Sequence, residues 1–199
     1  MKRLVFIALS VLPLASHAAD WTQEPKSFRS ITLGEPLASQ FPECAKDKTG
    51  AYAYGPQNVC WETDNKPNPI AHNAIIAGVY NLPDIGIGDT LIKGLHPTAV
   101  YLLDGKVEAI SLNFNAARYD TFLELLTGKF GAPTASDHIT PTVTNQVWGR
   151  LNIWSGPSVK MKFVEFYLGA ERSRFDIETA KYAALESADN QQQKQQDNL

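Results

Sequence analysis

Residues 100–114, VYLLDGKVEAISLNF, decide the fold, because they predict two strands and the tight turn between them. Val100 to Leu103 and Lys106 to Phe114 flank Asp104-Gly105, a dipeptide that is the strongest short-range signal of a β-hairpin. Strands joined by so short a turn must run antiparallel. The stretch therefore predicts an antiparallel sheet at the centre of the protein.

A helix is predicted directly after this hairpin. Its apolar side chains recur three and four residues apart, which places them on one stripe of an α-helix: Tyr119, Phe122, Leu123, Leu126 and Phe130. Gly131 stands where a left-handed C-terminal cap belongs, and Pro133 prevents continuation. We expect the apolar stripe to pack against the sheet.

Further strands and two short helices are predicted on both sides of this unit. The strands are Ile31–Leu33, Ala74–Tyr80, Val143–Trp154, Val159–Leu168 and Phe175–Thr179, and the helices start near Glu35-Pro36-Leu37 and at Lys181. The segment from Cys44 to Pro69 is rich in Gly, Pro, Asn, Asp and Lys, a composition typical of a long surface loop. The predicted fold class is α+β: an antiparallel sheet built from hairpins, one main amphipathic helix packed on one face, and a disulfide-closed N-terminal loop.

The first eighteen residues have the layout of a secretory signal peptide. Basic Lys2 and Arg3 precede an apolar run, Leu4–Leu14, and small residues follow up to Ala18. About eleven apolar residues are too few for the ~20 that a membrane-spanning helix needs. We therefore expect residues 1–18 to be removed, 19–187 to form a single domain without membrane insertion, and the glutamine-rich residues 188–199 to form a disordered polar tail. The expected location is the periplasm, although an extracellular protein begins with the same signal.

Cys44 and Cys60 are the two cysteines of the chain. In an oxidising compartment an isolated pair at this separation most often forms a disulfide. A metal site or a nucleophilic thiol would need more ligands or a base nearby, and the nearest histidine, His72, comes twelve residues after Cys60. We expect a disulfide that stabilises the fold by about 3 kcal/mol.

Charge argues against two classes of partner. The chain has 18 basic and 21 acidic residues, and removal of Lys2 and Arg3 with the signal leaves 16 basic residues and a net charge of −5. Nucleic-acid binding rests on neutralising phosphates with basic residues. Attachment to anionic lipid needs a basic cluster. We therefore expect neither nucleic acid nor a lipid surface as a partner.

No motif in the sequence predicts a catalytic centre, a metal site or a cofactor. The hydrolase patterns G-x-S-x-G and S-x-x-K are absent, and Gly86-Ile87-Gly88 lacks the third glycine of a dinucleotide loop. His72, His96 and His138 show no metal-ligand spacing, so a zinc site would require distant residues to converge. Exposed loop histidines are the simpler interpretation.

Three carboxylates, Glu108, Glu165 and Glu178, lie on predicted strands and could form a catalytic pair such as glycoside hydrolysis requires. Charged residues on the solvent face of a sheet explain them equally well.

Aromatic residues form the candidate binding surface. Trp148, Arg150 and Trp154 share one parity of a predicted strand, which makes an aromatic patch if it faces solvent and packing if it faces the core. Tyr52, Tyr54 and Trp61 flank or lie within the disulfide loop. A closed loop is pre-organised for binding, although these rings could equally cover a small core beneath it.

These observations favour a non-catalytic module that binds another envelope protein, as an inhibitor, an immunity-type partner or an assembly factor does. The alternatives are a small hydrolase of envelope polymer that uses sheet carboxylates, and a carrier of a small apolar ligand beneath the helix.

Overall fold

The computed structural model describes residue 21 and residues 23–50, 58–67, 74–83, 85–87, 90–92, 98–139, 149–166 and 171–196. The predicted signal peptide, residues 1–18, lies outside these ranges.

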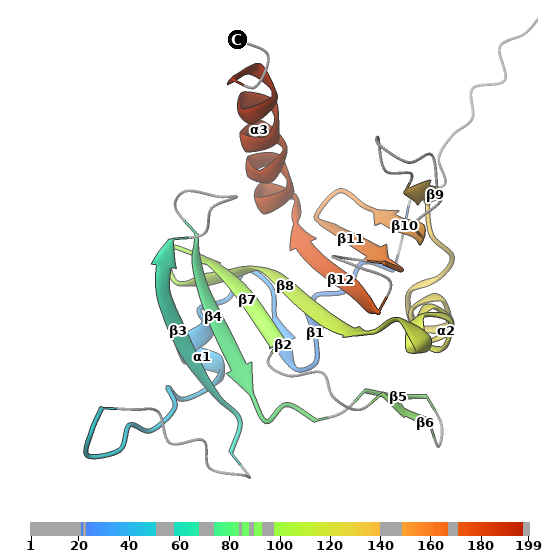
Figure 1. Ribbon diagram of the computed structural model, residues 1–199. Helices are drawn as coiled ribbons and strands as arrows, with labels where there is room; N and C mark the ends of the chain where they lie inside the picture. Colours follow the sequence, from blue (N-terminus) through green and yellow to red (C-terminus); the bar gives the residue numbers. More distant parts are fainter. Residues whose placement is uncertain are drawn as a thin grey trace, which may run out of the picture.

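One eight-stranded antiparallel sheet organises the chain (Figure 1). In spatial order its strands are β3 (Cys60–Pro67), β4 (Ile75–Tyr80), β7 (Thr98–Leu103), β8 (Lys106–Asn115), β12 (Arg172–Thr179), β11 (Val159–Val164), β10 (Gly149–Ser155) and β9 (Ala135–Ile139). The last strand in the sequence, β12, therefore lies in the middle of the sheet, between β8 and β11. With its helices and one disulfide, the protein has the predicted α+β class.

The central hairpin, β7–β8, is confirmed. Asp104 and Gly105 both have positive φ, 53° and 76°, as the two central residues of a type I′ turn require. Asp tolerates this conformation better than most residues, and Gly adopts it at no steric cost. The dipeptide thus fixes the pairing of two strands that are largely buried.

The inner face of the sheet, on which Phe163 and Phe175 lie, carries the main core. The helix α2 (Tyr119–Phe130), preceded by a 3-10 turn at Ala116–Arg118, packs on it with the predicted stripe. The rings of Phe122 and Phe163 meet edge to face at 5.4 Å, and both are fully buried. Gly131, with φ of 83°, ends the helix as expected.

The N-terminal segment covers the rest of the inner face. It forms the hairpin β1 (Ser27–Phe28) and β2 (Ile31–Thr32) and then the short helix α1 (Leu37–Gln40), drawn in blue behind the sheet in Figure 1. After β2 the chain pairs with the start of β8: the Gly34 N–H donates to the Val107 carbonyl at 2.7 Å, and the Val107 N–H donates to Glu35 at 3.0 Å. β12 pairs with β8 from Ala109 onward, and the N-terminal segment forms the hydrogen bonds of β8 at Val107, just before that point.

The outer face, opposite the α2 side, is polar around β11 and β12. Helix α3 (Ala180–Gln196) starts there, and its Tyr182 is buried against Tyr101 and Ala109. Beyond Glu186 most described side chains of α3 are exposed, and in Figure 1 the helix projects away from the sheet.

Several elements differ from the sequence-based expectation. Residues Cys60–Pro67, expected within a surface loop, form the edge strand β3. Strand β9 was not expected, and a separate hairpin, β5 (Ile85–Ile87) and β6 (Thr90–Ile92), follows β4. Helix α3 continues to Gln196, nine residues beyond the end that we expected for the folded domain.

Candidate functional site

The predicted disulfide joins Cys44 to Cys60, with Cα atoms 4.8 Å apart. Beside it the Cys44 N–H donates to the Trp61 carbonyl at 2.9 Å, and the Trp61 N–H donates to the Pro42 carbonyl at 3.0 Å. Residues 42–44 thus cover the start of the edge strand β3. Both ends of the loop between the cysteines are fixed to the sheet.

Residues 45–50 of this loop are all exposed and lead away from the sheet at the lower left of Figure 1. At the other end of the loop Asn58 is exposed, and Val59 is half-buried against the main core. The conformation of residues 45–50 is set locally. The Asp47 carboxylate accepts hydrogen bonds from the Thr49 N–H at 2.7 Å and from the Thr49 hydroxyl at 2.6 Å. The Gly50 N–H donates to the Asp47 carbonyl at 3.0 Å, and Gly50 has a φ of 83° that suits glycine. The loop therefore presents a tight turn, Asp47–Gly50, to solvent.

Trp61 holds the base of this loop. Its side chain is half-buried against the main core, and its indole N–H donates to the Phe41 carbonyl at 2.9 Å. Of the two interpretations left open for the loop aromatics, Trp61 fits packing. Tyr52 and Tyr54 lie outside the described residues.

The parity shared by Arg150 and Trp154 faces the core. Trp154 is fully buried, and its indole N–H donates to the Gly131 carbonyl at 2.8 Å. Leu151 and Ile153 lie half-buried on the opposite face. Trp148 lies outside the described residues, so the structure brings only Arg150 and Trp154 of the expected patch together, and Trp154 has no exposed surface.

Arg150 is held between the sheet and α2. Its guanidinium donates hydrogen bonds to Glu165 at 3.0 Å and to Asp120 at 2.8 Å. It also lies over the Tyr119 ring, 4.5 Å from the ring centre. The hydrogen bond from Arg150 holds the pKa of Glu165 below its usual range.

Tyr119 is also held through its hydroxyl group. The Asn152 amide donates to the Tyr119 hydroxyl at 2.6 Å, and the Ser136 hydroxyl donates to the Asn152 carbonyl oxygen at 2.7 Å. Burial raises the pKa of Tyr119 to about 12. These contacts connect α2 with β9, β10 and the end of β11, which is a structural role.

The three strand carboxylates bind three different cations. Glu165 bonds Arg150, as described above, and Glu178 lies 2.9 Å from the Lys162 ammonium. Glu108 accepts the Thr179 hydroxyl at 2.5 Å, with Lys181 at 3.4 Å. The hypothesis of a hydrolase that uses two of these carboxylates stays a prediction.

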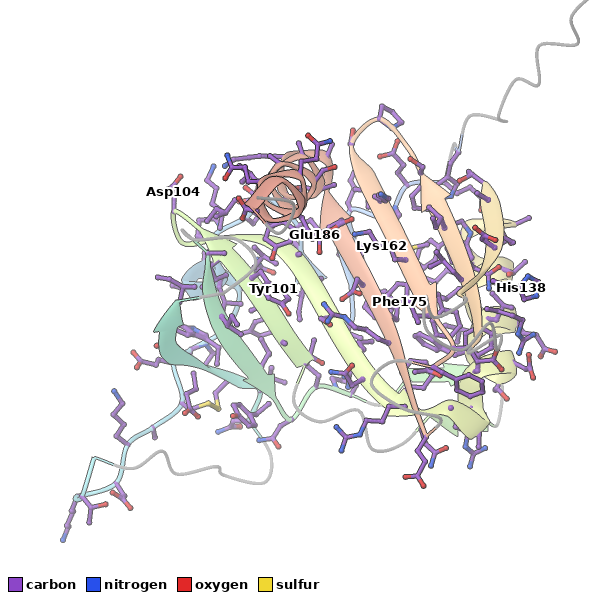
Figure 2. All side chains as sticks on the ribbon, turned by 45° about the horizontal axis from the view of Figure 1, so that its top comes forward. Tyr101, Asp104, His138, Lys162, Phe175 and Glu186 are labelled. Carbon is purple, nitrogen blue, oxygen red and sulfur yellow. A yellow bond between two sulfur atoms is a disulfide. The ribbon has the colours of Figure 1, made fainter. Side chains whose placement is uncertain are left out.

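A cluster of partly buried charges lies on the outer face, where Lys162 and Glu186 come together in Figure 2. The Lys162 ammonium lies 2.5 Å from Glu186 on α3 and 2.9 Å from Glu178 on β12, the latter pair being off hydrogen-bond geometry. The Glu178 side chain is 3% exposed. Burial raises the pKa of Glu178; burial also opposes the charge of Lys162, but the two carboxylates outweigh it and raise the pKa of Lys162. This triad fastens α3 to the sheet.

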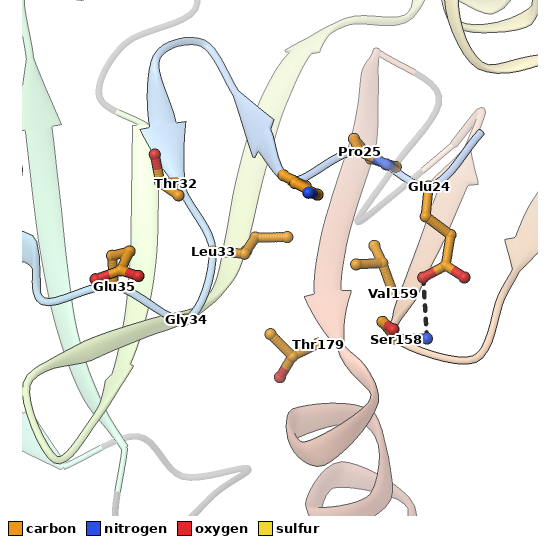
Figure 3. A pocket seen from close by; sticks show the side chains of 10 residues that line it. Glu24, Pro25, Thr32, Leu33, Gly34, Glu35, Ser158, Val159 and Thr179 are labelled. Atoms are coloured by element: carbon orange, nitrogen blue, oxygen red, sulfur yellow. Dashed lines mark hydrogen bonds between the residues drawn. The ribbon is translucent and has the colours of Figure 1, made fainter. Parts of the chain in front are cut away.

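A pocket of about 490 Å³ lies on the inner side, between the N-terminal segment and the ends of β11 and β12 (Figure 3). We call it the 24–35 pocket. It is lined by Glu24, Pro25, Lys26, Thr32, Leu33, Gly34, Glu35, Ser158, Val159 and Thr179. The sequence analysis missed it, and it does not lie beneath α2, where a carrier's cavity was expected.

Within the described ranges, no three His, Cys, Asp or Glu residues are grouped so that they could hold a metal ion. His138 is exposed on β9, and His72 and His96 lie outside those ranges. No described helix is long and apolar enough to cross a membrane.

Comparison with known proteins gives no relative from which a function could be carried over, since no family model, curated protein or solved structure matches the chain.

Proposed function

We propose that this chain is an exported, non-catalytic module of the periplasm that binds another envelope protein through its disulfide loop. The observation that supports the proposal is the described part of the loop: its ends are fixed by a disulfide and backbone hydrogen bonds, and the Asp47 carboxylate fixes the exposed turn Asp47–Gly50. Residues that are already fixed lose little conformational entropy on binding, so more of the contact energy appears as affinity. Functional residues are also concentrated on exposed loops that a rigid scaffold positions.

The buried disulfide is consistent with an oxidising compartment, because disulfides persist there and are rare in reducing ones. The predicted signal peptide supports the same location. In this proposal the disulfide fixes the two ends of the binding loop.

The test compares matched surface variants of the mature chain in affinity capture from a Gram-negative periplasmic extract without reductant. Lys48→Glu reverses a charge at the exposed tip, and Thr49→Ala removes a hydroxyl bonded to Asp47. Lys106→Glu reverses an equally exposed lysine beside the β7–β8 turn and serves as the control. All three should fold like the wild type.

If the proposal holds, a stoichiometric protein partner is captured by the wild type and by Lys106→Glu, and its affinity falls at least about tenfold with Lys48→Glu. Reduction of the disulfide should weaken capture in the same way. Capture that is unchanged by the tip variants, or no partner at all at low salt, would refute it.

A further inference from the structure

The walls of the 24–35 pocket are fixed by hydrogen bonds. On one side the Glu24 carboxylate accepts the Ser158 N–H at 2.9 Å. On the other, the Gln40 amide accepts the Thr32 N–H at 2.6 Å and donates to the Thr32 carbonyl at 3.0 Å, while Gly34 pairs with β8. The pocket is therefore formed before any ligand arrives, as most small-molecule sites are.

The centre of the pocket is apolar and its ends are acidic. Pro25 and Val159 are buried and Leu33 is half-buried. In Figure 3 Glu24 and Glu35 stand on opposite sides of the Leu33 and Val159 side chains. A ligand that fills this space must have an apolar body that is contacted by carboxylate groups.

Four backbone donors and one hydroxyl donor of the lining are already used. Two backbone N–H groups donate to side chains, that of Thr32 to Gln40 and that of Ser158 to Glu24. Two others donate to backbone carbonyls, that of Leu33 to Lys26 and that of Gly34 to Val107. The Thr179 hydroxyl donates to Glu108. The side chains that remain are the carboxylates of Glu24 and Glu35, which only accept hydrogen bonds, the hydroxyls of Thr32 and Ser158, which can accept or donate, and the exposed ammonium of Lys26. Such a lining can accept several hydrogen bonds from a ligand that donates them.

Charge leads to the same class of ligand. Among the ten lining residues two are acidic and one, the exposed Lys26, is basic, so the pocket has a net charge of −1. A carboxylate or phosphate would be repelled by two carboxylates, Glu24 and Glu35, and attracted by one exposed ammonium, that of Lys26. From these observations we infer that the 24–35 pocket is a binding site for an alkylammonium group, a primary amine on an apolar stem. Both a free amine and a lysine side chain of another polypeptide have this chemistry.

The first experiment uses wild-type mature protein, so it does not depend on the folding of any variant. ¹⁵N-labelled protein is titrated with hexylamine, hexanoate and 1-hexanol, which share one alkyl chain and differ in charge. Hexylamine has seven non-hydrogen atoms and should bind with a Kd of roughly 1 mM, shifting the amide signals of Gly34 and Val159. Hexanoate and 1-hexanol should bind at least about tenfold more weakly. Equal affinities for the three ligands, or no shifts with hexylamine, would overturn the inference.

A lysine derivative, Nα-acetyl-lysine N-methylamide, separates the two sources of the amine. Affinity equal to that of hexylamine indicates that a protein lysine fits the pocket. Binding of hexylamine alone indicates a free amine, and both results support an alkylammonium site.

Charge variants then assign the binding to this pocket. The double variant Glu24→Gln, Glu35→Gln keeps an acceptor for the Ser158 N–H and should weaken hexylamine about tenfold. Lys26→Met removes the repelling charge and should strengthen it about twofold. Glu124→Gln, an exposed site on α2, is the control and should change nothing. If the double variant binds hexylamine as the wild type does, the site is not this pocket.

Discussion

Replacing Lys162 by methionine should destabilise the protein by about 3 kcal/mol at about pH 7, because it leaves the Glu178 carboxylate buried without its counter-ion. Removing one partner of a buried ion pair costs about 3–5 kcal/mol, and the 24% exposure of Lys162 places this case at the lower end. The second pair, with Glu186, is more exposed, so Glu186→Gln should cost at most about 1 kcal/mol.

The penalty should depend on pH with a defined sign. Burial raises the pKa of Glu178 in the folded state above its unfolded value, so ionising it on the way to neutral pH costs folding free energy. Without Lys162 this pKa rises further. The difference in stability between wild type and Lys162→Met should therefore shrink as the pH falls below about 7, because the folded protein takes up the Glu178 proton at a higher pH than the unfolded chain does.

Urea unfolding of the mature protein at about pH 7 and at a series of lower pH values measures these differences. Lys160→Met is the comparison variant, because Lys160 lies opposite Glu178 on β11 and also favours its charge, but forms no ion pair with it; the change should cost less than about 1 kcal/mol. Adding Glu178→Gln to Lys162→Met should recover at least half of the loss, because the buried charge is then gone. A loss below about 1 kcal/mol, a loss that does not depend on pH, or no recovery in the double variant would refute this account of the triad.

Other predictions concern the disulfide, the core and the contact between Glu24 and Gly156. Cys44→Ala with Cys60→Ala should cost about 3 kcal/mol in oxidising buffer and nothing relative to the reduced wild type, as chemical denaturation will show. Phe163→Ala should cost roughly 3–5 kcal/mol, measured as a fall in the unfolding midpoint, because this ring is fully buried beneath α2. In Gly156→Ala the new Cβ would overlap the Glu24 carboxylate, so the variant should lose up to about 1 kcal/mol, whereas the same change in a Glu24→Ala background should be close to neutral in a double-mutant cycle.

Elements encoded by local pattern were predicted well from the sequence. The Asp104-Gly105 turn and the α2 stripe need only neighbouring residues to specify them. The pairing of Cys44 with Cys60 followed from there being two cysteines. Strand β3 was missed because Cys60–Pro67 has the composition of a loop, and its strand conformation comes from pairing with β4.

The last part of α3 was missed for a related reason. Glutamine, lysine and alanine have good helix propensity, but residues 188–196 have no apolar stripe by which a helix could be predicted.

Sites assembled from several secondary-structure elements could not be predicted from the sequence. Lys162, Glu178 and Glu186 come from three successive elements and meet because the register of β11 against β12 brings them to one face. The 24–35 pocket exists because the N-terminal segment crosses the sheet and replaces β12 beside Val107. Neither arrangement leaves a spacing in the sequence that a motif could detect.

The central place of β12 has a consequence for the order in which the protein can form. Strands β3, β4, β7 and β8 make one half of the sheet and β9, β10 and β11 the other, and residues 172–179 join the halves. A chain that emerges from its N-terminus has both halves before it has the strand that unites them, and each half then exposes an unpaired inner edge. Such edges pair readily with other chains. Native assembly must therefore wait for nearly the whole polypeptide, and a chain that stops before residue 172 should aggregate even though it retains seven of the eight strands of the sheet.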